Sequence, residues 1–184
     1  MKATKHLAIV STVAVSYVLL YLLNDTLFSA LGYGEGVSWI YLPSGLRLVF
    51  VLLFVEWGAV GITLASLFIS YCYQFHGDGL TILGAGLISG IAPWLARALC
   101  VDAFKLDVDL ANLTVPTLIK MAIIFSVLSP VLHQIWYVWR DVTPDFFSSV
   151  AVMAIGDLVG TLIMLFLAKR ILMALPTLGA ADPT

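Results

Sequence analysis

Two residues of opposite charge fall inside apolar stretches of this sequence, where a charged side chain is costly. Asp157 lies about halfway along the run from Phe146 to Leu167, and Arg47 lies near the start of residues 43–55. An ionised side chain at mid-membrane depth costs at least about 2.5–3.5 kcal/mol, so it persists only with a partner, a ligand or, for Asp157, a proton. We therefore expect Arg47 and Asp157 either to pair with each other or to form a ligand or proton site.

The composition requires lipid as the outer solvent. Of the 184 residues, 61% are hydrophobic and 11% are charged, whereas a soluble domain carries roughly 25% charged residues. The net charge is −2 with no basic cluster, which argues against nucleic acid as a partner. We expect an all-α, multi-pass membrane protein that forms a single domain over residues 1–184.

Six apolar runs are candidates for membrane-spanning helices, since about 20 apolar residues cross a bilayer. The second and third are short, and only Glu56-Trp57-Gly58 separates them, which predicts a tight helical hairpin. The expected six-helix bundle has helices at about residues 7–23, 43–55, 59–73, 80–101, 113–137 and 146–172.

The positive charges favour one orientation. With the N-terminus in the cytoplasm, six of nine Lys and Arg residues lie on the inner side, as the positive-inside rule requires. Both termini are then cytoplasmic. We expect the bacterial inner membrane as the location, with the lipid bilayer and a membrane or cytoplasmic protein as partners.

The start of the second run could form an anion site. Pro43 suits a first helical turn, and Gly45 allows a close approach of another backbone. Free N–H groups there, with Ser44 and the guanidinium of Arg47, could bind an anion near the outer leaflet. Alternatively, Arg47 extends to the outer lipid headgroups.

The fifth run carries a polar stripe. Ser129, His133 and Tyr137 recur at four-residue spacing and so share one helix face. Pro130 lies beside them and bends a helix by removing a hydrogen bond. This pattern is typical of a cavity lining, although hydrogen bonds between helices also explain it.

Two pairs of glycines have the spacing that lets helices pack closely in membranes. Gly156 and Gly160 flank Asp157, while Gly86 and Gly90 lie in the fourth run. The first pair would hold Asp157 against protein instead of lipid.

The longest irregular segment, residues 24–42, combines aromatic residues with three glycines. It is either an interfacial aromatic belt or a lid over a site that opens outward.

No pattern for catalysis is present. The sequence lacks GxSxG, HExxH, a phosphate-binding lysine loop and CxxC. We expect a protein that is not an enzyme, and we assign no catalytic or metal-binding residue and no cofactor.

Two segments resemble MASE1-type membrane sensory domains. One runs from Tyr41-Leu42-Pro43-Ser44-Gly45-Leu46-Arg47 to about residue 70, and the other is Gly156-Asp157-Leu158-Val159-Gly160. The resemblance implies a sensory or ligand-binding module. Family members are generally fused to output domains that this chain lacks, so its signal would pass through a partner protein.

Two alternatives remain. The length, the late Asp-bearing helix and the outer loop also resemble the substrate-binding subunits of energy-coupling-factor vitamin transporters. A small accessory subunit of a larger membrane complex is the third possibility.

Overall fold

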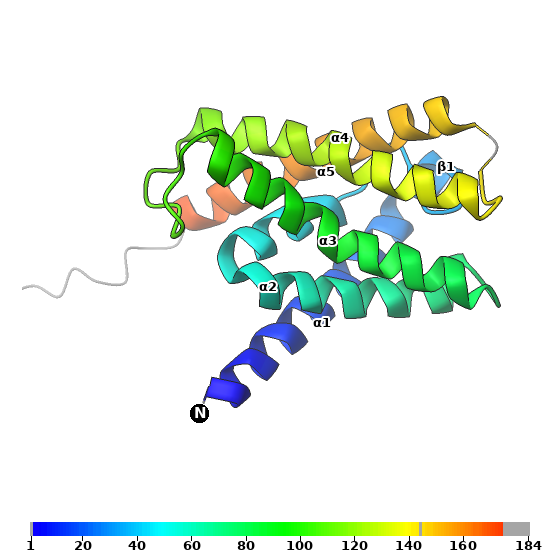
Figure 1. The fold of residues 1–184 in the computed structure, drawn as a ribbon, viewed down its shortest axis with the longest axis horizontal. Helices are drawn as coiled ribbons and strands as arrows, with labels where there is room; N and C mark the ends of the chain where they lie inside the picture. The colour runs from blue at the N-terminus through cyan, green and yellow to red at the C-terminus, as the bar shows by residue number, and fades with distance from the viewer. Residues whose placement is uncertain (1, 144, 175–184) are drawn as a thin grey trace, which may run out of the picture.

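The computed structural model describes residues 2–143 and 145–174, and it is predominantly helical (Figure 1). Its long helices are joined by short connections, with one small hairpin of two antiparallel strands after the first helix. In chain order the elements are α1 (Lys2–Phe28), the 3₁₀ turn η1 (Ser29–Leu31), β1 (Gly32–Gly34), β2 (Val37–Ser38), α2 (Pro43–Ile69), the π-helical turn η2 (Ser70–Gln74), α3 (Gly79–Ala103), α4 (Val115–Trp139) and α5 (Phe146–Ala174).

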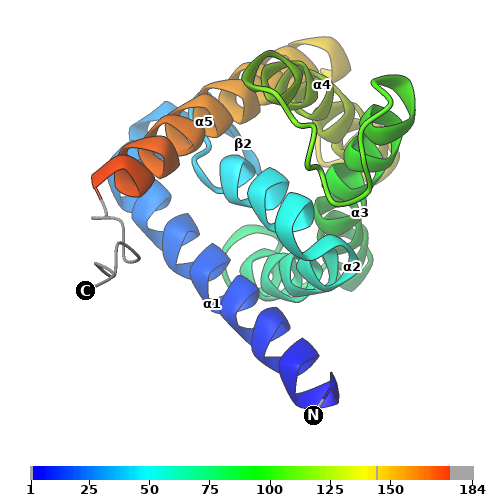
Figure 2. The same ribbon diagram turned by 90° about the vertical axis from the view of Figure 1, so that its left-hand side faces the viewer.

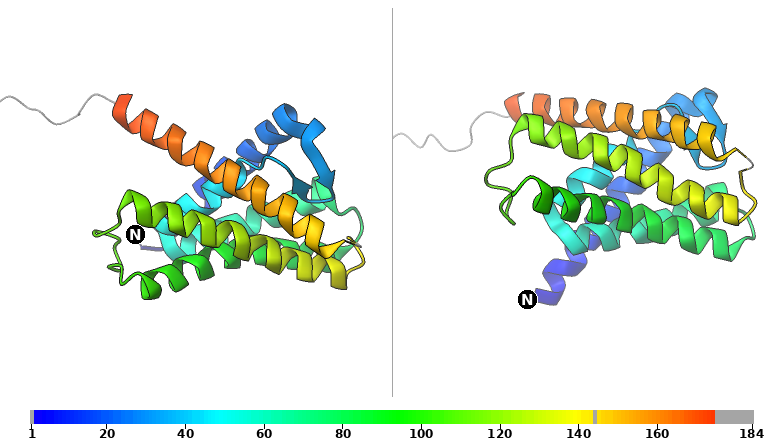
Figure 3. Two further views of the ribbon diagram at one scale, coloured as in Figure 1. Left: turned by 90° about the horizontal axis from the view of Figure 1, so that it is seen from above. Right: turned by 45° about the horizontal axis from the view of Figure 1, so that its top comes forward.

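Five segments within the described residues are long and apolar enough to cross a membrane. This agrees with the expected all-helical, multi-pass membrane architecture. The last part of α2 and helices α3–α5 run along the long axis of the molecule, and α1 crosses them obliquely (Figures 1 and 2). The N-terminus and the last turns of α5 lie at the same end of the bundle (Figures 1 and 3).

The expected count of six separate helices is not confirmed. The segments predicted at residues 43–55 and 59–73 form the single element α2, continued by η2. Inside α2, Val55 has non-helical backbone angles of φ 48° and ψ −114°. The chain turns sharply there and brings Gly58 so close to Phe50 that a Cβ on Gly58 would collide with the carbonyl oxygen of Phe50. The turn thus falls at Val55, one residue before the expected Glu56-Trp57-Gly58 connection.

Helix α2 begins inside the bundle rather than at its surface. The irregular segment that leads to it, residues 39–42, lies along α5, and the N–H of Tyr41 donates to the carbonyl of Gly156 at 3.2 Å. The N–H of Leu42 donates to the side-chain oxygen of Asn24 in α1 at 2.9 Å. Irregular backbone is tolerated at membrane depth only where protein satisfies its polar groups, and these bonds do so.

The distribution of side chains fits a bundle whose outer solvent is lipid. Large apolar residues such as Leu7, Leu19 and Leu53 are more than half exposed, whereas Arg47, Asp157 and Gln134 are almost fully buried. A water-soluble protein has the reverse tendency. The polar residues therefore lie where neighbouring helices meet, which is where the candidate site is found.

Candidate functional site

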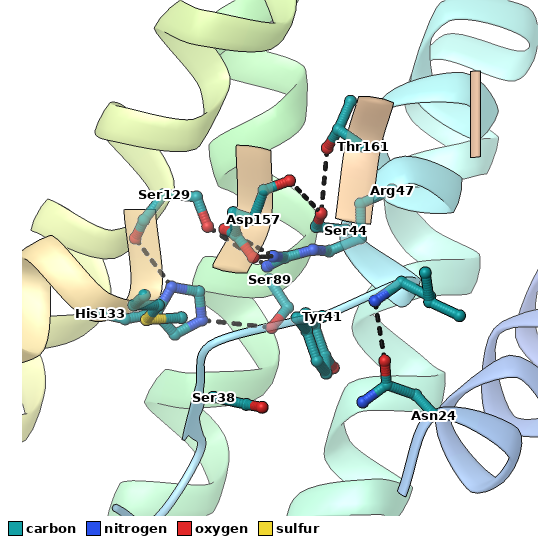
Figure 4. A network of polar contacts seen from close by, with 12 residues as sticks. Asn24, Ser38, Tyr41, Ser44, Arg47, Ser89, Ser129, His133, Asp157 and Thr161 are labelled. Atoms are coloured by element: carbon teal, nitrogen blue, oxygen red, sulfur yellow. Dashed lines mark hydrogen bonds and ion pairs between the residues drawn. The ribbon is translucent and has the colours of Figure 1, made fainter. Parts of the chain in front are cut away.

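An ion pair lies at the centre of the bundle (Figure 4). The Nη2 of Arg47 donates to both carboxylate oxygens of Asp157, at 2.8 and 2.9 Å. The side chains are 1% and 0% exposed. A buried pair of this kind offsets its desolvation cost only when its geometry is good and further groups are satisfied. The side chain of Arg47 is therefore buried between helices and does not extend to lipid headgroups.

Further contacts hold the guanidinium in place. The Nη1 of Arg47 donates to the hydroxyl of Ser129 in α4 at 3.2 Å. The rings of Tyr41 and Phe125 lie 5.5 and 5.2 Å from the guanidinium carbon, within the range of cation–π attraction. Arg47 thus connects α2 to α4 and α5 at one point.

The first turn of α2 is fixed against α5 by Ser44. Its hydroxyl donates to the backbone carbonyl of Asp157 at 2.6 Å and lies 2.9 Å from the hydroxyl of Thr161. The backbone N–H groups of Ser44 and Gly45 donate to the carbonyls of Tyr41 and Leu42, both at 3.1 Å. These donors are therefore already used within the chain, which removes two donors from the anion site expected at this helix start.

A second polar chain extends from Ser129 to α3. The Nδ1 of His133 lies 2.8 Å from the carbonyl oxygen of Ser129, and its Nε2 lies 3.2 Å from the hydroxyl of Ser89. A carbonyl oxygen only accepts, so Nδ1 carries the proton, and in the neutral ring Nε2 accepts from Ser89. The network thus joins α2, α3, α4 and α5.

A small polar chamber adjoins this network. It has a volume of about 20 Å³, and its lining includes Arg47, Ser89, His133 and Tyr137. The Nε of Arg47 is buried and has no hydrogen-bond partner among the described residues. The chamber is large enough for a water molecule, which needs roughly 10–15 Å³ and two or more polar partners.

A larger cavity opens near the hairpin. Its volume is about 340 Å³, and it lies between α1, the β1–β2 hairpin and η2. It shares three lining residues with the small chamber, namely Gly36, Tyr41 and Gln74. The segment that the sequence predicts as a belt or a lid therefore lines this cavity, and its Gly36 and Tyr41 also line the chamber.

The two glycine pairs contact different segments of the chain. A Cβ on Gly156 or Gly160 would collide with the carbonyl oxygen of Ser38 or Tyr41. This pair therefore accommodates the end of β2 and the irregular segment after it instead of the helix that its spacing suggests. Gly45 in turn lies against Met164 of α5, and Gly86 and Gly90 of α3 lie against α2. Pro43 occupies the first turn of α2, as expected.

Tyr137 lies in the same stripe as Ser129 and His133 but makes a different contact. Its side chain is 2% exposed and packs against Phe75, with ring centroids 5.4 Å apart. It also lies beside the hairpin, since a Cβ on Gly36 would come within 3.1 Å of its hydroxyl. The stripe thus runs from the ion pair to the underside of the hairpin.

Several members of the site were not predicted from the sequence. Asn24 binds a backbone group 18 residues away, Tyr41 covers the guanidinium, and Ser89 binds His133. Only Ser89 carried a usable signal, because it lies between Gly86 and Gly90 on a helix with few other polar residues.

Comparison with protein-family models, with curated proteins and with solved structures finds no match to this chain.

Proposed function

We propose that this protein is a multi-pass sensory or ligand-binding module of the bacterial inner membrane, similar to MASE1-type domains, that acts through a partner protein. Its ligand enters from the outside through the cavity beneath the hairpin. The buried ion pair and its hydrogen bonds then respond to occupancy by shifting α2 against α4 and α5. The protein itself performs no covalent catalysis.

The single observation that carries this proposal is the contact between the cavity and the buried network. The cavity and the chamber share Gly36, Tyr41 and Gln74, and Tyr41 also covers Arg47. Any ligand that displaces Tyr41 therefore changes the surroundings of a buried charge. Networks of this kind respond strongly to small changes, because an unpaired polar group in a low dielectric is costly.

Charge distribution supports the proposed orientation. The N-terminus and the end of α5 lie at the same end of the bundle (Figure 3). Lys5 lies in α1 and Lys169 in α5, near these ends, and Lys105 lies in the connection between α3 and α4. With the two parts of α2 counted separately, the chain makes six passes and both termini are cytoplasmic. The hairpin and its cavity then face outward.

The hairpin over the cavity also favours a second candidate. A substrate-binding subunit of an energy-coupling-factor-type transporter likewise needs an outward pocket beneath a loop. The two candidates differ in their partner, which is a signalling protein in the first and an ATPase module in the second.

Affinity purification from native membranes after cross-linking separates the candidates. We expect a partner with a kinase or second-messenger domain, whose activity changes in the Arg47→Lys variant but not in the Asp102→Asn variant. Asp102 is a suitable control because its side chain is 90% exposed and lies in α3, outside the site. Recovery of an ATPase module would support the transporter subunit instead. A large complex whose activity is the same in both variants would indicate an accessory subunit.

A further inference from the structure

The charges around the cavity beneath the hairpin are unbalanced. Asp25 and Glu35 line it, and no basic side chain does. Neither carboxylate forms an ion pair with a side chain that the structure describes. The cavity therefore carries a formal charge of −2, which attracts a cation.

The remaining walls are aromatic. Phe28 and Tyr41 line the cavity together with Tyr21 and Tyr73, whose ring centroids lie 5.8 Å apart at an interplanar angle of 48°. The face of an aromatic ring is negative and attracts ammonium groups, and aromatic cages bind quaternary ammonium ions. A hard metal ion would gain little from such walls, because Ca²⁺ needs six to eight oxygen ligands.

A buried amide adds an orienting group. Asn24 is 6% exposed and also lines the cavity. Its side-chain oxygen accepts the N–H of Leu42, which leaves the NH₂ group without a partner among the described residues. In Figure 4 this nitrogen lies on the side of Asn24 that faces Ser38, which is another lining residue. The free N–H group can donate to an oxygen of a bound molecule.

We propose that this cavity binds a small organic ammonium ion, with the cation between Asp25, Glu35 and the aromatic walls and an oxygen of the same molecule on Asn24. The volume of about 340 Å³ lies at the lower end of the usual range for ligand pockets, roughly 300–1,000 Å³. This inference rests on the proposed function, since it names the class of ligand for that site. The ammonium group belongs either to a free solute or to the headgroup of a zwitterionic lipid.

The test compares choline with 3,3-dimethylbutan-1-ol, its uncharged carbon isostere, as probes of the purified protein in nanodiscs of phosphatidylglycerol. Binding is measured by calorimetry and by the shift of the unfolding midpoint. We expect choline to bind about tenfold or more tightly than the isostere, since the two differ only in charge. The Asp25→Asn/Glu35→Gln double variant should lose this preference, whereas Asp102→Asn should keep it.

The Asn24→Leu variant tests the orienting group. It should weaken choline more than tetramethylammonium, because tetramethylammonium has no oxygen. Nanodiscs that contain phosphatidylethanolamine distinguish the two sources. Weaker binding of added choline in them identifies the lipid headgroup as the occupant, and unchanged binding identifies a free solute.

The inference would be overturned if choline and its isostere bound equally well. It would also be overturned if neither choline nor tetramethylammonium bound at millimolar concentration. Displacement of choline by millimolar Ca²⁺ with higher affinity would also overturn it in favour of a metal site. Failure of this inference can be distinguished from failure of the proposed function. A signalling partner without ammonium binding removes only the ligand class, whereas ammonium binding without a partner removes only the signalling role.

Discussion

Arg47 and Asp157 lie 110 residues apart in the sequence, yet one guanidinium nitrogen donates to both carboxylate oxygens of Asp157. Their pairing joins the start of α2 to the middle of α5, and Ser129 adds α4 to the same point. The two charges cancel within the core, so neither needs solvent. The ion pair therefore holds α2, α4 and α5 together at one buried point.

The shape of the guanidinium should matter as well as its charge. Arg47→Lys keeps a positive charge but cannot reach both carboxylate oxygens from one nitrogen and Ser129 from another. We expect a loss of about 1–3 kcal/mol in the free energy of unfolding, the range for an unsatisfied buried polar group. SDS titration of the purified protein measures this loss, and a variant as stable as the wild type would refute the geometry.

A methyl group on the glycine face of α5 should destabilise the protein. Gly160→Ala would place a Cβ against the carbonyl oxygen of Tyr41, which is backbone and cannot rotate away. We expect this variant to lose about 1–3 kcal/mol, as overpacked cores do, and to loosen the cavity by displacing residues 39–42. Gly79→Ala is the matched control, because nothing lies within 4 Å of its added Cβ. Equal stability of the two variants would contradict the packing described.

The turn inside α2 should tolerate glycine better than valine. Val55 has φ 48°, which is strained for a β-branched residue but ordinary for glycine. We expect Val55→Gly to keep or increase the free energy of unfolding. Val60→Gly, in a regular part of α2, should instead lose about 1 kcal/mol. SDS titration compares the two variants, and a greater loss at Val55 would show that its backbone is not strained.

The contact between the start of α3 and the end of α4 should respond to acid. Hydrogen bonds from Thr81, with Arg140 beside them, lower the pKa of Asp78 from 3.8 to about 2. A carboxyl group with a lowered pKa stabilises the fold above its unfolded pKa and loses that contribution as the pH falls toward its folded pKa. The stability difference between the wild type and Asp78→Asn should therefore be present at pH 7 and shrink between about pH 4 and 2. A difference that is constant with pH would contradict this.

The sequence allowed prediction of the features that depend on the cost of burying charge. The apolar runs located most helices, and Arg47 and Asp157 stood out because charges inside such runs are expensive. The contacts of Gly156 and Gly160 could not be predicted fully. Glycine spacing indicates a close approach but does not say whether a helix or irregular backbone approaches.

Other features depend on tertiary structure alone. A turn was expected at Glu56-Trp57-Gly58, but its position at Val55 has no local signal, since valine is neither a turn residue nor favoured at positive φ. The bond between Asn24 and Leu42 links α1 to residues that are irregular in structure. Only the folded bundle brings these groups together, so residues 24–42 were predicted only as an aromatic belt or a lid, and the chemistry of the cavity was not predicted.

The most direct test of the central claim is a double-mutant cycle on the ion pair. Arg47→Met, Asp157→Leu and the double variant are compared with the wild type by SDS titration. Each single change leaves one buried charge unpaired and should cost about 3–5 kcal/mol. The double variant should be more stable than the sum of the two losses predicts, with a coupling energy of about 2 kcal/mol or more. Losses that add without coupling would show that the two residues do not pair, and the account of this site would then be wrong.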